Sequence, residues 1–292
     1  MQSKTFSPNA RKFAKLYTLA QAIQAGGDVE ISKALLQLQC DPDFSGKAWQ
    51  ANFAKLADAI TSGKPAFSVF SLSGNSKLPF VSFSSLPGVT CPGAGECLDF
   101  CYSFRAWRYP AAFMRQAQNA YFMRFNNAPI AQAFSDIVKA RPDGFDFRLY
   151  VDGDFSGVAD IHFWMQTMRQ HPTVRAYGYS KSFAALLGYD IGGDPWPSNY
   201  QLNISGGHNA SAAMIAAVKS LPIVRGEFVA VSIGRKVKSS DHGKAETNAA
   251  IRQAMAGEKV FPCPGACGSC TGKGHACGML ALKGVKIAIA MH

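Results

Sequence analysis

The arrangement of the cysteines constrains this chain more than any other feature of its sequence. Seven of the eight cysteines fall into two short groups. The first group is a triad and the second a group of four: Cys91, Cys97 and Cys101, then Cys263, Cys267, Cys270 and Cys277. The eighth, Cys40, ends a predicted helix, and we expect it to be a buried apolar residue. Core cysteines rarely occur as four in one Gly-rich loop, so the two groups predict metal binding.

The cellular compartment expected for the chain argues against disulfides. Residues 1–16 are polar and basic and lack the apolar stretch of a secretory signal. There is no run of about 18 apolar residues, so we expect no membrane span and no membrane partner. We expect the chain to stay in the reducing cytoplasm, where disulfides are rare.

The triad has the features of a cluster-binding loop with an open coordination position. Five and then three residues separate its thiols, and two glycines and a proline lie between Cys91 and Cys97. Such a loop turns thiolates inward and points backbone N–H groups at a negatively charged cluster. Three thiolates leave one iron of a 4Fe–4S cluster open to a substrate or cofactor. The alternative is zinc, with His162 or His208 as a fourth ligand brought near by the fold.

The group of four predicts a closed site. Its spacings are three, two and six residues, so four thiolates lie within fifteen residues. Such a set ligates one 4Fe–4S cluster or one tetrahedral zinc ion. The spacing does not separate these two metals. A further alternative is that all seven cysteines converge on a single cluster.

Hydrophobic periodicity predicts an α/β fold with an N-terminal helical region. Residues 8–62 have helical spacing, interrupted at Gly26-Gly27 and at residues 41–43. Short strands are expected near residues 67–72 and 80–84. Beyond the triad, predicted helices alternate with predicted strands: helices at 111–125, after Pro129, and at 159–169, 210–218 and 244–255, and strands at 147–151, 174–179, 200–204, 228–233 and 285–290. This alternation implies parallel strands in a partial or irregular (β/α) barrel. We therefore expect a helical region at residues 1–65 and an α/β domain at 66–292.

Polar residues follow three of the predicted strands. In α/β barrels the functional sites lie at the carboxyl ends of strands, so these residues are candidate cofactor ligands: Asp152, Asp154, Lys181, Ser205 and Gly206. Each also has a structural interpretation. Asp154 suits a turn that caps a helix, Gly206 a glycine turn before a helix, and Lys181 a solvated loop.

The net charge favours polyanionic partners. Lys and Arg total 30 and Asp and Glu total 19, a formal charge of +11, which suits nucleic acid. The basic residues are scattered, so a generically basic protein is the alternative. Arginines interleave with aromatic residues after the triad, an arrangement that can contact phosphates and stack bases or instead pack over a cluster: Arg105, Arg108, Arg115 and Arg124. The sequence does not indicate an oligomeric state.

The triad resembles the cluster-binding loop of radical SAM proteins. It follows a strand and ends in Cys101-Tyr102, although its spacing is wider than is usual in that superfamily. The resemblance implies that the open iron binds the amino and carboxylate groups of S-adenosylmethionine (SAM). It also implies that Asp154 contacts the SAM amino group, as a Gly-Gly-Glu-Pro-like segment does at a comparable place in those proteins.

A closer resemblance is to phage and plasmid iron–sulfur proteins of the gene-product-eighty-eight type. Four stretches carry it and together span roughly residues 66–292: residues 86–97, Cys101-Tyr102, residues 153–155 and residues 287–292. The leading hypothesis is a cytoplasmic iron–sulfur protein with one or two 4Fe–4S clusters and radical SAM-like chemistry at the triad. The alternative is a non-catalytic nucleic-acid-binding protein with structural iron–sulfur or zinc sites.

Overall fold

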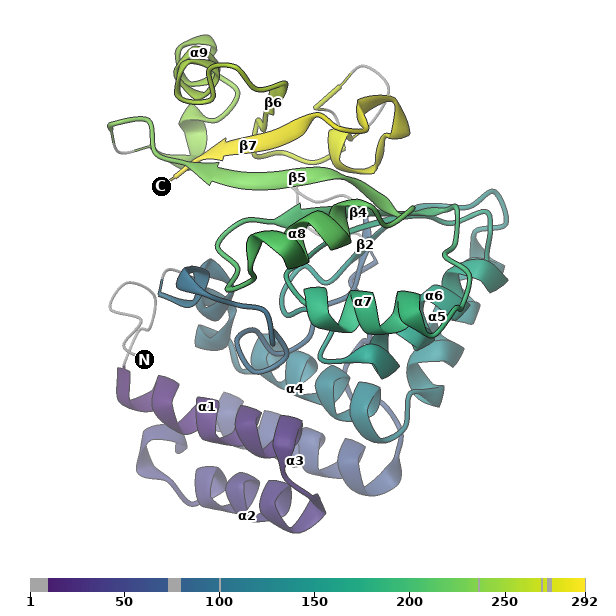
Figure 1. Cartoon of the computed structure of the whole chain (residues 1–292). Coiled ribbons are helices and arrows are strands. Elements are labelled where there is room, and N and C mark those ends of the chain that lie inside the picture. Colours follow the sequence, from purple (N-terminus) through teal and green to yellow (C-terminus); the bar gives the residue numbers. More distant parts are fainter. Residues whose placement is uncertain are drawn as a thin grey trace.

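A single parallel sheet organises the protein. The computed structural model describes residues 10–72, 80–99, 101–235, 237–268, 270–271 and 275–291. Its strands form one seven-stranded sheet in the order β1-β2-β3-β4-β5-β7-β6 (Figure 1). Every neighbouring pair is parallel. The strands are β1 (Val81–Ser82), β2 (Asp146–Leu149), β3 (Arg175–Ser180), β4 (Tyr200–Ser205), β5 (Val224–Val231), β6 (Val260–Pro262) and β7 (Lys286–Ala290). The predicted α/β class with a partial barrel is confirmed.

Helices precede the sheet and connect its strands. The α-helices are α1 (Ala10–Ala25), α2 (Asp28–Gln39), α3 (Lys47–Ser62), α4 (Pro110–Phe125), α5 (Ala128–Ala140), α6 (Val158–Gln170), α7 (Phe183–Ile191), α8 (Ala212–Lys219) and α9 (Ala245–Ala254). The short 3₁₀ helices are η1 (Pro42–Phe44), η2 (Glu96–Leu98), η3 (Tyr102–Arg108), η4 (Ser239–Asp241), η5 (Ala276–Gly278) and η6 (Leu280–Leu282). Residues 8 and 9, where the first predicted helix begins, lie outside the described residues.

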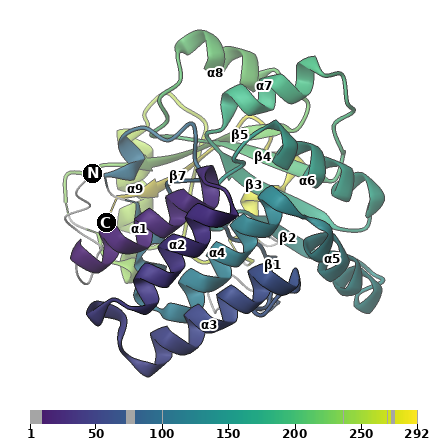
Figure 2. The same ribbon diagram turned by 90° about the horizontal axis from the view of Figure 1, so that it is seen from below.

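The N-terminal helices confirm the predicted helical region. They break at the two predicted places, because α1 ends before Gly26-Gly27 and η1 separates α2 from α3. Figure 2 shows α1, α2 and α3 stacked beside α4. One apolar cluster joins all four helices to η3, where Phe104 and Trp107 are buried. The prediction of a buried Cys40 is wrong: this residue is the C-cap of α2 and is exposed, because the chain leaves the helix towards solvent there.

The two faces of the sheet have different surroundings. Side chains alternate along a strand, so Phe147 and Leu149 of β2 enter the main apolar core with Leu202 of β4. This core includes Trp164 of α6. The opposite face of β3 carries Tyr177, which packs in a separate cluster with residues of the C-terminal segment.

A buried hydrogen-bond network fixes the C-terminal segment on that second face. Arg225 of β5 donates from Nε to Asn203 Oδ1 at 2.7 Å, from Nη1 to the Leu282 carbonyl at 2.8 Å and from Nη2 to the Val285 carbonyl at 3.1 Å. Asn203 in turn donates to the Cys277 carbonyl at 2.9 Å. Both Arg225 and Asn203 are almost completely buried. The last cysteine is therefore connected to two central strands.

Some elements differ from their prediction. Helix α7 and strand β6 are not among the elements predicted from the sequence. Strand β5 begins at Val224, four residues before the predicted start, and ends earlier as well. The strand expected at residues 67–72 is reduced to one antiparallel bridge between Ser71 and Ser82, so it adds no ladder to the sheet.

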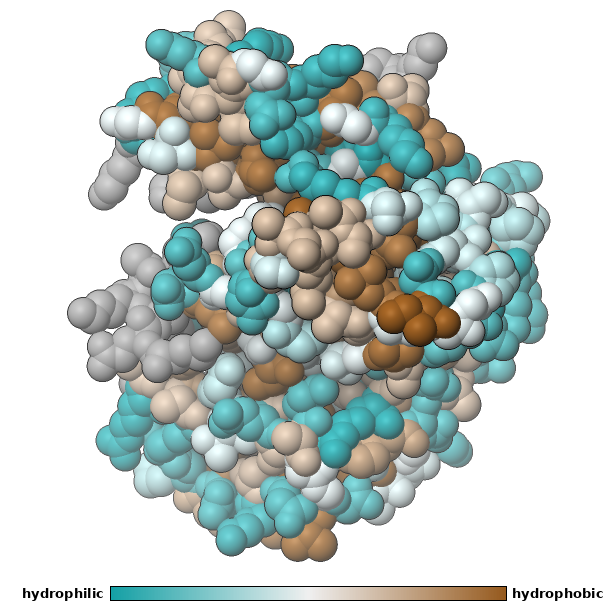
Figure 3. All heavy atoms as spheres, viewed as in Figure 1, coloured by the Kyte–Doolittle hydropathy of each residue, from teal (hydrophilic) through white to brown (hydrophobic). Residues whose placement is uncertain are grey.

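The helices of the described residues include no candidate for a membrane span. None of the helices in these ranges is long and apolar enough to cross a membrane. On the face drawn in Figure 3, hydrophilic and hydrophobic side chains are interspersed over the helices.

Replacing Arg225 should destabilise the protein strongly. Arg225→Ala removes the guanidinium that donates to Asn203 Oδ1 and to the carbonyls of Leu282 and Val285 in a buried site. We expect the free energy of unfolding, measured by urea denaturation, to fall by about 3 kcal/mol. The control is Arg175→Ala, which removes only a largely exposed ion pair with Asp146 and should cost less than about 1 kcal/mol. Similar losses in the two variants would contradict this account of the network.

Candidate metal centre

The loop that carries Cys91, Cys97 and Cys101, called the triad loop below, lies across the carboxyl edge of the sheet. It follows β1 and docks on the loop after β4 through backbone hydrogen bonds. The Gly95 and Cys97 N–H groups donate to the Gly207 carbonyl at 3.1 and 3.4 Å, and the Asn209 N–H donates to the Gly93 carbonyl at 3.2 Å. Strand pairing thus places the triad where the carboxyl ends of parallel strands meet.

Glycines permit this close docking. A Cβ added at Gly93 would collide with the carbonyl of Lys181, which follows β3. Gly207 has a φ of +74°, and a Cβ there would lie 3.1 Å from the Cβ of Cys97. Both positions therefore require glycine, one for space and the other for its left-handed backbone as well.

Lys181 supplies a positive charge beside the triad. Its Nζ donates to Ser205 Oγ at 2.8 Å, so two predicted cofactor ligands from neighbouring loops are in direct contact. Burial and the Asp154 carboxylate raise the pKa of Cys91, whereas the Lys181 ammonium acts in the opposite direction. A cation at this place suits either a thiolate or an anionic ligand.

Asp154 has a structural role that its sequence position did not reveal. Its Oδ1 accepts from Ser180 Oγ at 2.7 Å and from the Phe155 N–H at 2.8 Å, and its Oδ2 accepts from the Lys181 N–H at 2.7 Å. It does not cap α6, whose N-cap is Gly157. Both oxygens are thus engaged in holding the end of β3. Direct contact of Asp154 with a cofactor stays a prediction.

Asp152 lies on the other side of the triad. Its Oδ2 accepts from Gln116 Nε2 of α4 at 3.0 Å. Burial raises the pKa of Asp152, while Ser103 and Arg148 oppose that rise. The Asp152 charge also raises the pKa of Cys101, for which burial is the main cause. The carboxylate therefore lies near the third thiol, and its predicted part in cofactor binding is untested.

Only one of the two histidines considered for zinc lies near the triad. The backbone of His208 forms an isolated antiparallel β-bridge with Ala94, which lies between Cys91 and Cys97. Burial lowers the pKa of His208, and this favours the neutral imidazole. His162 instead pairs with Asp194 at 3.0 Å and packs edge-on against Tyr189. Gly206, the remaining candidate, donates its N–H to the Phe228 carbonyl at 2.9 Å.

The group of four lies on the face of the sheet that carries Tyr177, opposite the main apolar core. This face is called the inner face below. Helix η5, which carries Cys277, packs on β3 and β4, and the four cysteines belong to the apolar cluster of Tyr177 and Ile287. Backbone N–H groups already point at two sulfurs. The Gly265 N–H donates to Cys263 Sγ at 3.4 Å, and the Ala276 N–H donates to Cys270 Sγ at 3.2 Å.

The surroundings of the group of four suit a sulfur-rich metal cluster. Among the residues that the structure describes, Tyr177 Oη and Arg148 Nε are buried without a hydrogen-bond partner. Both residues interact electrostatically with Cys267. Sulfides and thiolates of a cluster are acceptors for such donors. Within the described ranges, no three Cys, His, Asp or Glu side chains are grouped as a metal site.

The two cysteine groups form separate neighbourhoods. Cys91 interacts electrostatically with Cys101, and Cys101 with Cys97. In the group of four, Cys263 interacts with Cys267 and Cys270, and Cys277 with Cys263 and Cys267. Arg148 interacts electrostatically both with Tyr102, next to Cys101, and with Cys267.

Sequence reasoning missed Arg148 and the tyrosines of β3. Arg148 stands between Phe147 and Leu149 in a short strand, and its Cζ lies 5.0 Å from the ring centroid of Tyr179. The available signal was strand alternation: a charged residue on the face opposite two apolar neighbours needs polar surroundings there.

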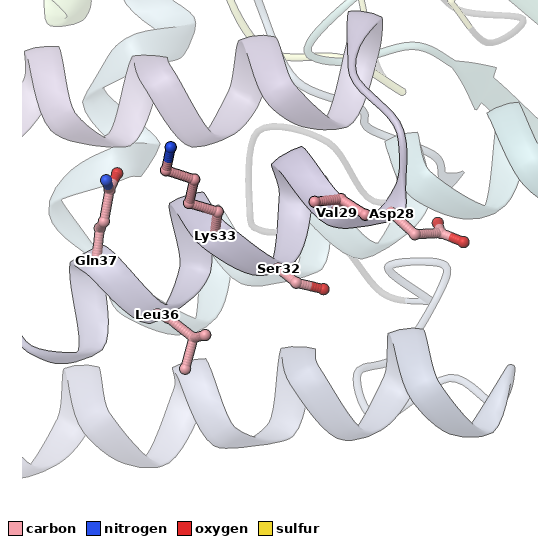
Figure 4. A pocket seen from close by; sticks show the side chains of 6 residues that line it. All are labelled: Asp28, Val29, Ser32, Lys33, Leu36 and Gln37. Atoms are coloured by element: carbon pink, nitrogen blue, oxygen red, sulfur yellow. The ribbon is translucent and has the colours of Figure 1, made fainter.

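The pocket shown in Figure 4 is lined by neither group of cysteines. It lies on the outer face of α2 and is lined by Asp28, Val29, Ser32, Lys33, Leu36 and Gln37. Its lining has no cysteine, histidine or pair of carboxylates, so it offers no metal chemistry.

Comparison with known proteins assigns a family to most of the chain. A family model described as gene product 88 matches residues 50–281, a range that includes both cysteine groups. Comparisons with curated proteins and with solved structures found no match.

Adding a methyl group at Gly93 should impair the triad alone. Gly93→Ala brings a Cβ against the Lys181 carbonyl, which forces the loop away from the sheet. After anaerobic reconstitution with iron and sulfide, we expect the variant to hold about half the iron of the wild type. The control is Gly157→Ala, where an added Cβ meets no atom within 4 Å. Full iron content in Gly93→Ala would contradict the docking role of this glycine.

Metal binding by the group of four should strengthen with pH. Burial raises the pKa of Cys263 to about 11 and that of Cys277 to about 12. Both thiols are therefore protonated in the metal-free protein at neutral pH and must release protons to bind metal. Each proton released raises the affinity by about tenfold per pH unit, so these two thiols alone contribute about 100-fold per pH unit.

The measurement is a Co²⁺ titration, followed by thiolate-to-metal absorption between about pH 6 and pH 8. It uses a variant in which the three triad cysteines are serine. An affinity that does not change with pH would show that the thiols are not buried and protonated as described.

Proposed function

We propose that this chain, which belongs to the gene product 88 family, is an iron–sulfur protein with two separate 4Fe–4S clusters and radical SAM-type activity at the triad. The observation that carries the proposal is the position of the triad. Three thiols lie at the carboxyl edge of a parallel sheet, beside a lysine and two aspartates from the loops after β2 and β3.

The triad provides an incomplete ligand set. Cys91, Cys97 and Cys101 supply three thiolates to a cluster of four irons. A cluster held by these three thiolates would leave one iron open for SAM and would supply the electron for its reductive cleavage. His208 lies close to the loop and is the candidate that would close the site if the metal were zinc.

Residues around the triad have distinct roles in this proposal. Lys181, held by Ser205 at 2.8 Å, offers its ammonium to the carboxylate of SAM. Asp154 orients Lys181 through the 2.7 Å bond that it accepts from the Lys181 N–H. Asp152, whose charge acts on Cys101, is a second candidate for the SAM amino group. Gly206 has no side chain, so it leaves room for a ligand at the carboxyl edge of the sheet.

The group of four serves as an auxiliary cluster. Its four thiolates complete a closed site, so it relays electrons or maintains the fold rather than binding SAM. Its cysteines pack with Tyr177 and Tyr179 on the face of the sheet opposite the main apolar core, which supports a site of its own.

Reductive cleavage of SAM tests the proposal. Protein reconstituted with iron and sulfide, reduced with dithionite and given SAM should release 5′-deoxyadenosine, detected by liquid chromatography. Cys91→Ser should abolish the product because it removes a ligand of the open cluster. Lys181→Met should weaken SAM binding about tenfold or more by removing a charge-assisted hydrogen bond.

The matched control is Lys219→Met, which removes a lysine that pairs with Glu227. The outcome that would sink the enzyme proposal is a fully loaded protein that gives no product and no SAM-induced change in the cluster's EPR spectrum.

A second candidate function is nucleic-acid binding without catalysis. The observation in its favour is the outer face of η3 and its C-cap, where Arg105, Arg108 and Tyr109 are exposed. The aromatic residues Phe104 and Trp107 of the same segment are buried instead. This candidate predicts DNA or RNA binding that weakens steeply with salt. Absent or salt-independent binding by the loaded protein would count against it.

A further inference from the structure

Arg148 is the charged residue shared by the two cysteine neighbourhoods. It lies on β2, between strand β1, which leads into the triad loop, and strand β3, on which η5 packs. Its guanidinium lies over the ring of Tyr179, with Cζ 5.0 Å from the centroid. The residues with which it interacts electrostatically include Tyr102 of the triad loop and Cys267 of the group of four.

The Arg148 charge acts on several acidic groups around it. Its electrostatic partners include Cys263 and Cys277 in the group of four and Asp152 beside the triad. A guanidinium stays protonated at any pH at which the protein is folded, so this charge is permanent.

One donor of Arg148 is unpaired within the described part of the chain. Its Nε atom is buried and has no hydrogen-bond partner among those residues. An unpaired buried donor is costly. A negatively charged acceptor at the group of four would offset this cost.

We propose that Arg148 is the positioning and tuning residue of the C-terminal cluster: it donates a hydrogen bond to that cluster and stabilises its reduced form. The inference rests on the proposed function, since it requires iron–sulfur at the group of four. A reduced cluster carries one more negative charge than its oxidised form, so a fixed positive charge beside it favours reduction.

The experiment measures the reduction potential of the C-terminal cluster alone. The background is a variant in which Cys91, Cys97 and Cys101 are serine, so that EPR-monitored redox titration reports one cluster. In this background Arg148→Gln should lower the ratio of reduced to oxidised cluster about tenfold at a given applied potential, a shift of about 59 mV to more negative values for one electron.

Two further variants separate tuning from folding. Arg148→Lys keeps the charge and should retain most of the wild-type potential. Arg141→Gln removes another guanidinium that stacks on an aromatic ring, 5.5 Å from the centroid of Phe145 in the main core, and should leave the potential unchanged.

Each outcome bears on the inference. A loaded Arg148→Gln variant with the wild-type potential overturns it, and so does an equal shift in Arg141→Gln. If Arg148→Gln fails to bind iron while Arg148→Lys binds it, the charge requirement is supported. If both fail while Arg141→Gln loads, Arg148 serves the fold and the inference is wrong. A background protein that binds zinc instead of iron overturns the proposed clusters first, and the inference with them.

Discussion

Parallel pairing of all seven strands is the constraint on which the rest of the structure depends. It brings the carboxyl ends of β1, β2, β3 and β4 to one edge, so loops far apart in sequence converge there. The triad loop after β1 reaches the loops after β3 and β4 through backbone hydrogen bonds and close glycine contacts. The same sheet offers an inner face, on which the C-terminal cysteines lie. Two distinct thiol sites thus follow from one topology.

Much of this architecture could be predicted from the sequence. Period-two and period-3.6 patterns located most helices and strands, and strand-end positions correctly grouped Lys181 with Ser205. The contact between the inner face and the segment that carries Cys277 could not be predicted. This segment follows β3 by about a hundred residues in the sequence, and Arg225 and Asn203 hold it in place. Arg148 was missed for the same reason, since its surroundings come from a distant segment. Cys40 was misjudged because a helix end, unlike a helix face, has no periodicity to show its exposure.

Charge and hydrogen bonding distinguish the two thiol groups. The triad has a lysine, two aspartates and an incomplete set of thiols, which suits a site that exchanges ligands. The group of four has a complete set, N–H groups directed at sulfur and aromatic neighbours. Hydrogen bonding and solvent exclusion are the means by which a protein sets the potential of a cluster. The gene product 88 match spans both groups, so the family's defining region contains the whole arrangement.

The central claim, that the two thiol groups hold separate iron–sulfur clusters, is tested most directly by metal and sulfide analysis of the anaerobically reconstituted protein. The account predicts about eight iron and eight sulfide per chain, with about half retained when either group alone is replaced by serine. A wild-type content of about four iron that is lost in both sets of variants would show a single shared cluster. Zinc without sulfide at either group would contradict the claim for that group.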